Sequence, residues 1–172
     1  MDYGMRTEKV HVGIMEYEYN GIKFYFIDNE YYFKCDSPYS PDLRWDIERF
    51  TFFCKAVLAI MPVVGFRPDI IHCHDWQASM IPVFLHTAFA TNPFYSMTKT
   101  IMTIHNLKFQ GVWDIDLFKY NTALPDYMFT SDKLEFHKNA NMLKGGLVYA
   151  DYITTVSETY SNEIKYEFFG EQ

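Results

Sequence analysis

Hydrophobic and polar positions first alternate along the chain and then recur at helical spacing. Two β-rich runs within 9–28 flank Asn20-Gly21, a dipeptide typical of a two-residue hairpin turn. Farther on, the pattern predicts a helix that begins at Ser40-Pro41 and is stopped by Pro62. The apolar residues that recur at helical spacing in this stretch are Ile47, Phe50, Phe53, Val57 and Met61.

The rest of the chain predicts strands and helices in alternation. The three predicted strands are 69–73, 99–104 and 152–156. A helix through about residue 88, kinked by Pro82, follows the first strand, and a helix over 140–149 precedes the third. The stretch 107–135 has little regular pattern, and Ser157 is placed to cap a last helix. This order predicts an α/β, Rossmann-like three-layer sandwich with a mostly parallel sheet.

The carboxyl ends of these strands carry the candidate functional residues. His74, Asp75 and Trp76 follow the first strand, and His105 and Asn106 follow the second. In open parallel sheets ligands bind at this edge, so we predict the functional site there. His105 can donate a hydrogen bond to a sugar hydroxyl or to a leaving phosphate. It can equally tie down the following loop, and the spacing leaves both roles open.

Composition narrows the class of protein. The chain has 172 residues, 49% of them hydrophobic, which suits one domain with a real core. Its net charge of -7 argues against nucleic acid as a partner. The sequence has no basic run and no apolar segment long enough to span a bilayer, so it does not predict contact with a membrane. Three cysteines without a Cys-x-x-Cys motif disfavour a disulfide framework and a structural zinc site, so we expect a cytoplasmic protein.

Two further clusters admit competing interpretations. His72 and His74 share one face of the predicted strand, and with Asp75 and His105 they are candidate metal ligands. Their spacing matches no standard ligand pattern, and one of the two histidines can instead be buried and hydrogen-bonded in the sheet. Residues 144–146, Lys-Gly-Gly, lie inside a helical pattern, so they predict close packing of a helix on the sheet rather than a phosphate loop.

Several blocks of sequence, read together, carry a resemblance to a known family. The three blocks are 67–77 (RPDIIHCHDWQ), 103–107 (TIHNL) with Gln110-Gly111 after it, and 143–151 (LKGGLVYAD) followed by 154–157 (TTVS) and Thr159-Tyr160. Their order and spacing resemble those of bacterial glycogen synthases and plant starch synthases across nearly the whole chain. Three separate motifs in order make the resemblance specific.

The resemblance implies the GT-B architecture, in which two Rossmann-like domains face each other across a cleft. It also implies retaining transfer of glucose from ADP-glucose to the non-reducing end of an α-1,4-glucan such as glycogen, without a metal or other cofactor. By position, His105 and Asp75 resemble the family's catalytic-site residues. A substrate-binding role is expected for the flanking residues Asn106, Trp76, His74 and Gln110.

The chain also departs from the family's pattern. The resemblance identifies 1–172 as a partial N-terminal domain without its first strand–helix unit, whose Lys-x-Gly-Gly loop holds the donor phosphates. The C-terminal nucleotide-binding domain is also expected to be absent, and the loop at 35–41 differs from the family's Gly-containing loop. We therefore expect an exposed sheet edge, self-association through it, and no activity of this chain alone.

Two rival functions remain open at this stage. A non-catalytic α-glucan-binding module would use exposed aromatic side chains to hold the polysaccharide, and aromatics form 19% of this chain. A metal-dependent hydrolase would use the histidines and Asp75 as ligands.

Overall fold

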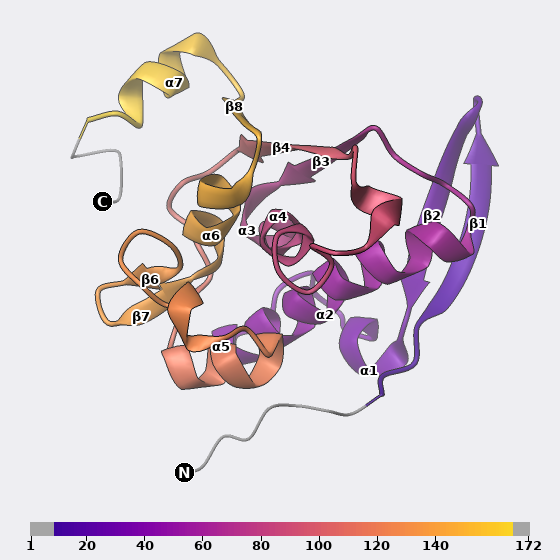
Figure 1. The fold of residues 1–172 in the computed structure, drawn as a ribbon, viewed down its shortest axis with the longest axis horizontal. Helices are drawn as coiled ribbons and strands as arrows, with labels where there is room; N and C mark the ends of the chain where they lie inside the picture. The colour runs from indigo at the N-terminus through magenta and orange to yellow at the C-terminus, as the bar shows by residue number, and fades with distance from the viewer. Residues whose placement is uncertain (1–8, 167–172) are drawn as a thin grey trace.

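The computed structural model describes residues 9–166, in which two small sheets and one parallel sheet are joined by helices (Figure 1). The strands are β1 (Gly13–Tyr19), β2 (Ile22–Asp28), β3 (Ile70–His74), β4 (Lys99–Ile104), β5 (Val112–Trp113), β6 (Glu135–Phe136), β7 (Asn139–Asn141) and β8 (Tyr152–Thr155). The α-helices are α1 (Glu30–Phe33), α2 (Leu43–Val63), α3 (Asp75–Ala78), α4 (Met80–Leu85), α5 (Ile115–Thr122), α6 (Met142–Tyr149) and α7 (Glu158–Glu163). Two short 3-10 helices are η1 (Pro93–Tyr95) and η2 (Asp126–Met128). No helix in 9–166 is long and apolar enough to cross a membrane.

The N-terminal hairpin confirms the prediction from Asn20-Gly21. Strands β1 and β2 pair antiparallel from Gly13 opposite Asp28 to Tyr19 opposite Ile22. Both turn residues have positive φ, 51° at Asn20 and 76° at Gly21, as a primed two-residue turn requires. The hairpin stands out from the rest of the molecule (Figure 1).

Helix α2 confirms the predicted helix but corrects its ends. It begins at Leu43, not at Ser40-Pro41, because the Asp42 side chain accepts a hydrogen bond from the backbone N–H of Arg44. Pro62 lies inside the last turn and does not stop the helix, which ends one residue later. A proline so close to a helix end interrupts few hydrogen bonds.

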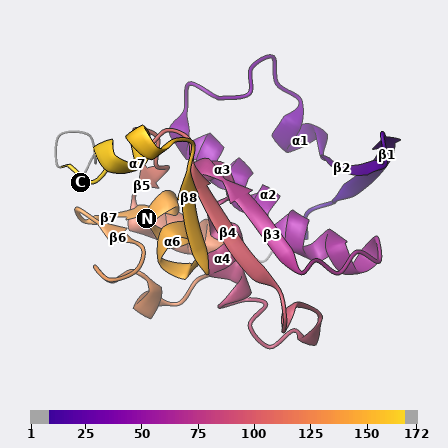
Figure 2. The same ribbon diagram turned by 90° about the horizontal axis from the view of Figure 1, so that it is seen from above.

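The central sheet has the predicted parallel topology. Its strand order is β3-β4-β8, and these three strands run side by side in Figure 2. Ile71, Cys73 and Met102 are buried on the face toward the helices, whereas His72 and His74 point to the opposite face. Helices α2, α4 and α6 pack together behind the buried face (Figure 2).

The region after β3 departs from the expected single helix. Two short helices, α3 and α4, meet at Ser79, and the second ends at Leu85 rather than near residue 88. Pro82 has no N–H group to donate to the carbonyl of Ala78, so a continuous helix would lose that hydrogen bond. The Ser79 hydroxyl donates instead to the carbonyl oxygen of Trp76 at 2.7 Å.

The stretch 107–135 is predicted to be irregular, but it contains helix α5. Strand β5 before α5 and strands β6 and β7 after it form a small antiparallel sheet with strand order β5-β7-β6. Its strands are two or three residues long, too short to show a period in the sequence. The sheet leads directly into α6, where the Asn141 side chain accepts a hydrogen bond from the backbone N–H of Lys144.

Helix α6 approaches the α3–α4 junction closely at Gly146. A Cβ atom built at Gly146 would lie 2.7 Å from the carbonyl oxygen and 2.9 Å from the Cα of Ser79. At Gly145 the nearest atoms belong to the side chains of Leu134 and Val83, at 3.1 and 3.2 Å. The sequence prediction that this glycine pair allows close packing is confirmed, although the neighbour is a helix junction and not a strand.

We expect Gly146→Ala to destabilise the protein by about 1–3 kcal/mol, because backbone atoms of Ser79 must move. Gly145→Ala is the matched control, since flexible side chains can shift and alanine favours the helix by about 1 kcal/mol. Chemical denaturation of both variants would measure the difference. Equal free energies of unfolding for the two variants would contradict this account of the contact.

The outer edges of the parallel sheet carry exposed apolar side chains. Within 9–166 β3 and β8 each pair only with β4, so each is an outer strand. Ile70 on β3 is 56% exposed, and Tyr152 and Ile153 on β8 are also exposed. Self-association through such an edge remains a prediction.

We expect purified chain 1–172 to associate as its concentration rises and Ile70→Lys to shift it toward monomer, because a charge on an edge strand opposes strand pairing. Sedimentation velocity would measure the distribution. Val148→Lys, at an exposed position on α6, is the matched control and should associate like the parent. A monomeric parent would rule out this use of the edge.

Candidate active site at the carboxyl ends of the central strands

The parallel pairing of β3 with β4 brings the predicted site residues together. His74, the last residue of β3, pairs with Thr103, and β4 ends one residue farther on. Asp75 and His105, each just beyond its strand, therefore lie side by side. Both stand at the edge of the sheet where ligands bind in such folds.

Asp75 joins the two strand ends through its carboxylate. Its Oδ1 accepts hydrogen bonds from the backbone N–H groups of His105, at 2.7 Å, and of Asn106, at 3.4 Å. Asp75 itself has a φ of 55°, in the left-handed region that aspartate tolerates better than most residues. This conformation turns the chain sharply from β3 into α3.

Three imidazole rings form a row that ends at His105, the residue whose backbone Asp75 binds. His74 Nδ1 is 3.0 Å from His105 Nε2, within hydrogen-bond distance. The rings of His72 and His74 lie with their centroids 4.2 Å apart. His72 Nε2 is 2.6 Å from the hydroxyl of Thr103, which confirms the expected hydrogen bond in the sheet. Both histidines of β3 are nevertheless exposed.

The environment of His74 favours its neutral form. Desolvation by burial is the largest cause that lowers the pKa of His74, followed by the nearby rings of His72 and His105. Asp75 acts in the opposite direction and does not outweigh them. A neutral imidazole has one donor and one acceptor nitrogen, so the pair His74–His105 can share one neutral hydrogen bond.

The structure offers no support for the metal-ligand interpretation. Among residues 9–166 no group of three or more His, Cys, Asp or Glu side chains is arranged to hold a metal ion. The metal-dependent hydrolase would need such a group from His72, His74, Asp75 and His105.

The flanking residues divide into cavity wall and loop anchor. Asn106 is exposed, and its side chain accepts a hydrogen bond from the backbone N–H of Lys108. Trp76 is only 4% exposed, and its ring packs edge-on against Phe50. Gln110 donates to the carbonyl of Leu107 and accepts from the Asn141 side chain, so both ends of its amide hold the loop in place.

A cavity of about 570 Å³ opens beside Asp75. Its lining residues are Tyr39, Ser40, Leu43, Asp46, Asp75, Trp76, Gln77, Asn106 and Phe109. The walls combine aromatic rings with carboxylate and amide groups, a mixture that suits a sugar, which has apolar faces and hydroxyl edges. His105 does not line the cavity itself, but its backbone N–H is bound by Asp75, and its neighbour Asn106 is on the wall.

Tyr39 is a site residue that the sequence did not identify. Its hydroxyl oxygen accepts a hydrogen bond from Gln77 Nε2 at 3.1 Å, across the cavity mouth. The surrounding segment has no period, so nothing in the local pattern sets Tyr39 apart from the many other aromatic residues. Only the fold brings it opposite the residues that follow β3.

A buried ion pair in α2 holds the loop that carries Tyr39. Arg49 and Asp46 are bonded at 2.6 Å, with side chains 3% and 4% exposed. The Arg49 guanidinium also donates to the carbonyl of Pro38, and the Asp46 carboxylate accepts from the backbone N–H of Ser40. Residues on both sides of Tyr39 are thus tied to one helix.

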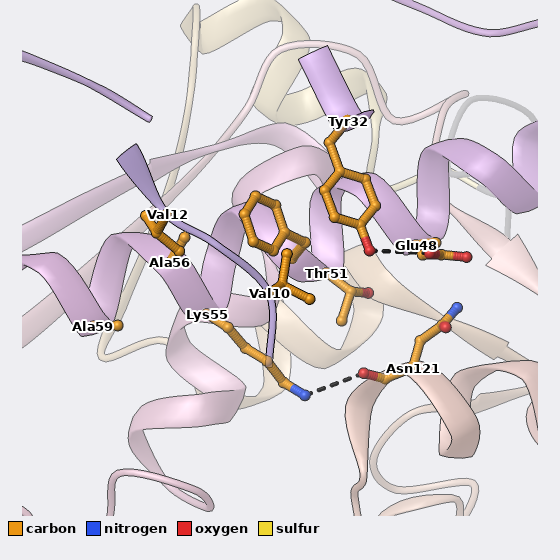
Figure 3. Close-up of a pocket in the computed structure, with 10 residues that line it drawn as sticks. Val10, Val12, Tyr32, Glu48, Thr51, Lys55, Ala56, Ala59 and Asn121 are labelled. Atoms are coloured by element: carbon orange, nitrogen blue, oxygen red, sulfur yellow. Dashed lines mark hydrogen bonds between the residues drawn. The ribbon is translucent and has the colours of Figure 1, made fainter. Parts of the chain in front are cut away.

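A second cavity, of about 210 Å³, lies between α2 and α5, away from the strand ends (Figure 3). At its base Lys55 donates to the backbone carbonyl of Asn121, and Tyr32 donates to Glu48. The buried Thr51 hydroxyl and Asn121 amide have no hydrogen-bond partner in the described chain, so we expect ordered water beside them. None of the residues placed at the strand ends lines this cavity.

Comparisons with known proteins agree on one family. A sequence model described as "Starch synthase catalytic domain" matches residues 1–172. The chain is 58% identical over 171 residues to the glycogen synthase of Lachnospira eligens. This match covers 99% of this chain and 35% of that protein. It is 49% identical over 162 residues to the glycogen synthase of Bacillus cytotoxicus, covering 94% of this chain and 34% of that protein.

A solved structure agrees with this result. The catalytic domain of starch synthase IV from Arabidopsis thaliana, bound to ADP and acarbose, superposes with a TM-score of 0.83 and 25% identity. The match covers 93% of this chain and 33% of that chain. The chain thus spans about a third of the length of the relatives that it matches.

We expect the free energy of unfolding to fall as the pH drops below about 6.5, the ordinary pKa of histidine, partly because of His74. Its pKa is lower in the folded state, so the unfolded state binds more protons in the window between the two values. Acid therefore favours unfolding there. Denaturation at pH 7.5 and 5.5 should show a smaller loss for His74→Asn than for the parent. An equal or larger loss in the variant would contradict the lowered pKa.

Proposed function

The chain belongs to the starch synthase catalytic domain family, and from that premise we propose that it is part of a glycogen or starch synthase. The proposed reaction is retaining transfer of glucose from ADP-glucose to the non-reducing end of an α-1,4-glucan. The fold of the chain is the α/β, parallel-sheet fold of a GT-B starch synthase domain. We further propose that the whole protein works in the cytoplasm, needs no metal, and that 1–172 alone is inactive.

The observation that carries the proposal is the meeting of Asp75, His105 and Asn106 at one edge of the sheet, beside a cavity with aromatic and polar walls. Strand order, family resemblance and hydrogen bonding each select these same residues. The ADP and acarbose bound to the starch synthase IV domain support a nucleotide-sugar donor and a glucan acceptor for this chain.

The proposed chemistry breaks the bond between the anomeric carbon and the phosphate oxygen of the donor. Nucleoside diphosphate leaves with the bonding electrons, the oxygen of an acceptor hydroxyl takes its place on the same face of the sugar, and the hydroxyl proton passes to the leaving phosphate oxygen. Positive charge develops on the sugar and negative charge on the leaving phosphate. An enzyme accelerates such a step by holding polar groups where these charges form.

His105 and Asp75 have distinct proposed roles in that step. His105 is exposed at the strand end, where its ring can donate to a sugar hydroxyl or to a leaving phosphate oxygen. Asp75 fixes the backbone at His105 and places a carboxylate on the cavity wall, where it favours positive charge on the sugar. Neither acts as a covalent nucleophile in this proposal.

The remaining predicted substrate contacts carry different weight. Asn106 lines the cavity and is exposed, which supports direct contact with a sugar hydroxyl. Trp76 is buried in the cavity wall, so its proposed contribution is the shape of that wall. Gln110 supports the loop beyond Asn106 through its two hydrogen bonds.

The test is transfer of labelled glucose to glycogen by the full-length protein that contains this chain. We expect the parent to transfer from ADP-glucose, also with a metal chelator present, and to transfer less from UDP-glucose. His105→Ala should lower kcat by about 10²–10³-fold, because one hydrogen bond to developing charge is lost. His86→Ala, an exposed histidine at the end of α4, should match the parent.

Other results would select other functions. A parent that binds glycogen but transfers no glucose would favour the glucan-binding module. Transfer that stops with the chelator and returns with a divalent metal would overturn the metal-free reaction. Full activity of His105→Ala would remove His105 from the proposed site.

A further inference from the structure

We propose that His74 is a positioning residue, which holds the imidazole ring of His105 in one orientation and leaves one defined ring nitrogen for the substrate. This inference rests on the proposed function of His105 in glucose transfer. It replaces the expectation that His74 binds the substrate directly.

The rings of His74 and His105 are in contact. His74 Nδ1 lies 3.0 Å from His105 Nε2, and the ring planes are inclined by 50°. A hydrogen bond between two neutral imidazoles uses one donor and one acceptor nitrogen. Nε2 of His105 is therefore engaged, and its Nδ1 is the nitrogen left to meet a substrate. The hydrogen bond also couples the tautomers of the two rings, because the nitrogen that donates carries the proton and the nitrogen that accepts does not.

His74 is itself held in place. His74 is the last residue of a strand, and its ring lies 4.2 Å from that of His72. His72 Nε2 is 2.6 Å from the hydroxyl of Thr103, and that hydroxyl is 2.6 Å from the hydroxyl of Thr154. A row of polar contacts thus crosses all three parallel strands, which lie side by side in Figure 2. The ring that contacts His105 is supported by the sheet and not by a loop.

The next residue, Asp75, also binds His105. Asp75 binds the backbone N–H of His105, whereas His74 binds its side chain. Two consecutive residues at the end of β3 thereby fix both the backbone and the ring of one residue beyond β4. Without the His74 contact, the exposed ring of His105 would be free to rotate among its rotamers.

The lowered pKa of His74 agrees with this role. Desolvation and the neighbouring rings of His72 and His105 lower the pKa of His74 and so favour its neutral form near pH 7. A neutral His74 ring can share a hydrogen bond with His105 without placing a positive charge beside it.

The substitutions that test this role differ in where they place a hydrogen-bonding group. In asparagine the amide atoms sit on Cγ, as Nδ1 does in histidine, so His74→Asn keeps a partner for His105 Nε2. In glutamine the amide is one carbon farther from the backbone, so His74→Gln misplaces it. His74→Phe keeps a ring beside His72 but removes the hydrogen bond.

We expect the full-length protein to show a separation of kcat from KM. His74→Phe and His74→Gln should lower kcat for transfer from ADP-glucose by about 10–100-fold, since loss of orientation acts on the reacting geometry. Their KM for ADP-glucose should change less than about threefold, because His74 does not contact the donor. His74→Asn should keep kcat within about fivefold of the parent. Thermal unfolding of each variant checks folding, and His86→Phe is the control for loss of an imidazole elsewhere.

The possible outcomes separate the two proposals. If the parent and His86→Phe transfer glucose and all three His74 variants match them, His74 has no positioning role and the proposed function stands. A raised KM with unchanged kcat in Asn, Gln and Phe alike would show direct donor binding by His74 and overturn the inference. If His74→Phe fails to fold, the contrast between Asn and Gln decides. If the parent transfers no glucose, the proposed function is wrong, and this role of His74 falls with it.

Discussion

The parallel register of β3 on β4 is the constraint on which the candidate site depends. Because His74 pairs with Thr103, the residues just beyond each strand meet, and Asp75 can bind the backbone N–H of His105. A slip of one residue would turn His74 toward the helices and Cys73 toward the open face. The burial of Cys73 behind the sheet opposes such a slip, so the hydrophobic core also fixes the position of the site.

The layers behind and beside the sheet support this arrangement in different ways. Gly146 lets α6 lie against the α3–α4 junction, which keeps the start of α3, and with it Asp75, in place. On the other side, the buried pair Arg49–Asp46 ties down the loop that carries Tyr39. Buried charges are costly unless they are paired and hydrogen-bonded, and this pair is bonded to backbone groups of the loop, although Arg49 Nε has no hydrogen-bond partner among residues 9–166. The exposed site groups therefore rest on rigid, buried supports.

Much of the fold and part of the site followed from local pattern. The hairpin at Asn20-Gly21, the three parallel strands and the placement of His105 at a strand end each depend on a short run of residues, and the structure confirms them. The pattern predicts a single helix kinked at Pro82, but the chain breaks into α3 and α4 at Ser79, because the hydrogen bond that Pro82 cannot make falls one turn earlier. The small sheet β5-β7-β6 was missed because strands of two or three residues leave no periodic trace.

The sequence by itself determined the hairpin, the order of the three parallel strands, the edge where the site lies and the family, because periodicity, turn residues and motif spacing are local properties of the chain. Only the tertiary structure decided what each site residue touches. It joined Tyr39 to Gln77 by a hydrogen bond on the cavity wall, buried Trp76 in that wall, and set the ring of His74 against His105. Contacts between residues more than thirty positions apart depend on strand register and helix packing, which no local pattern encodes.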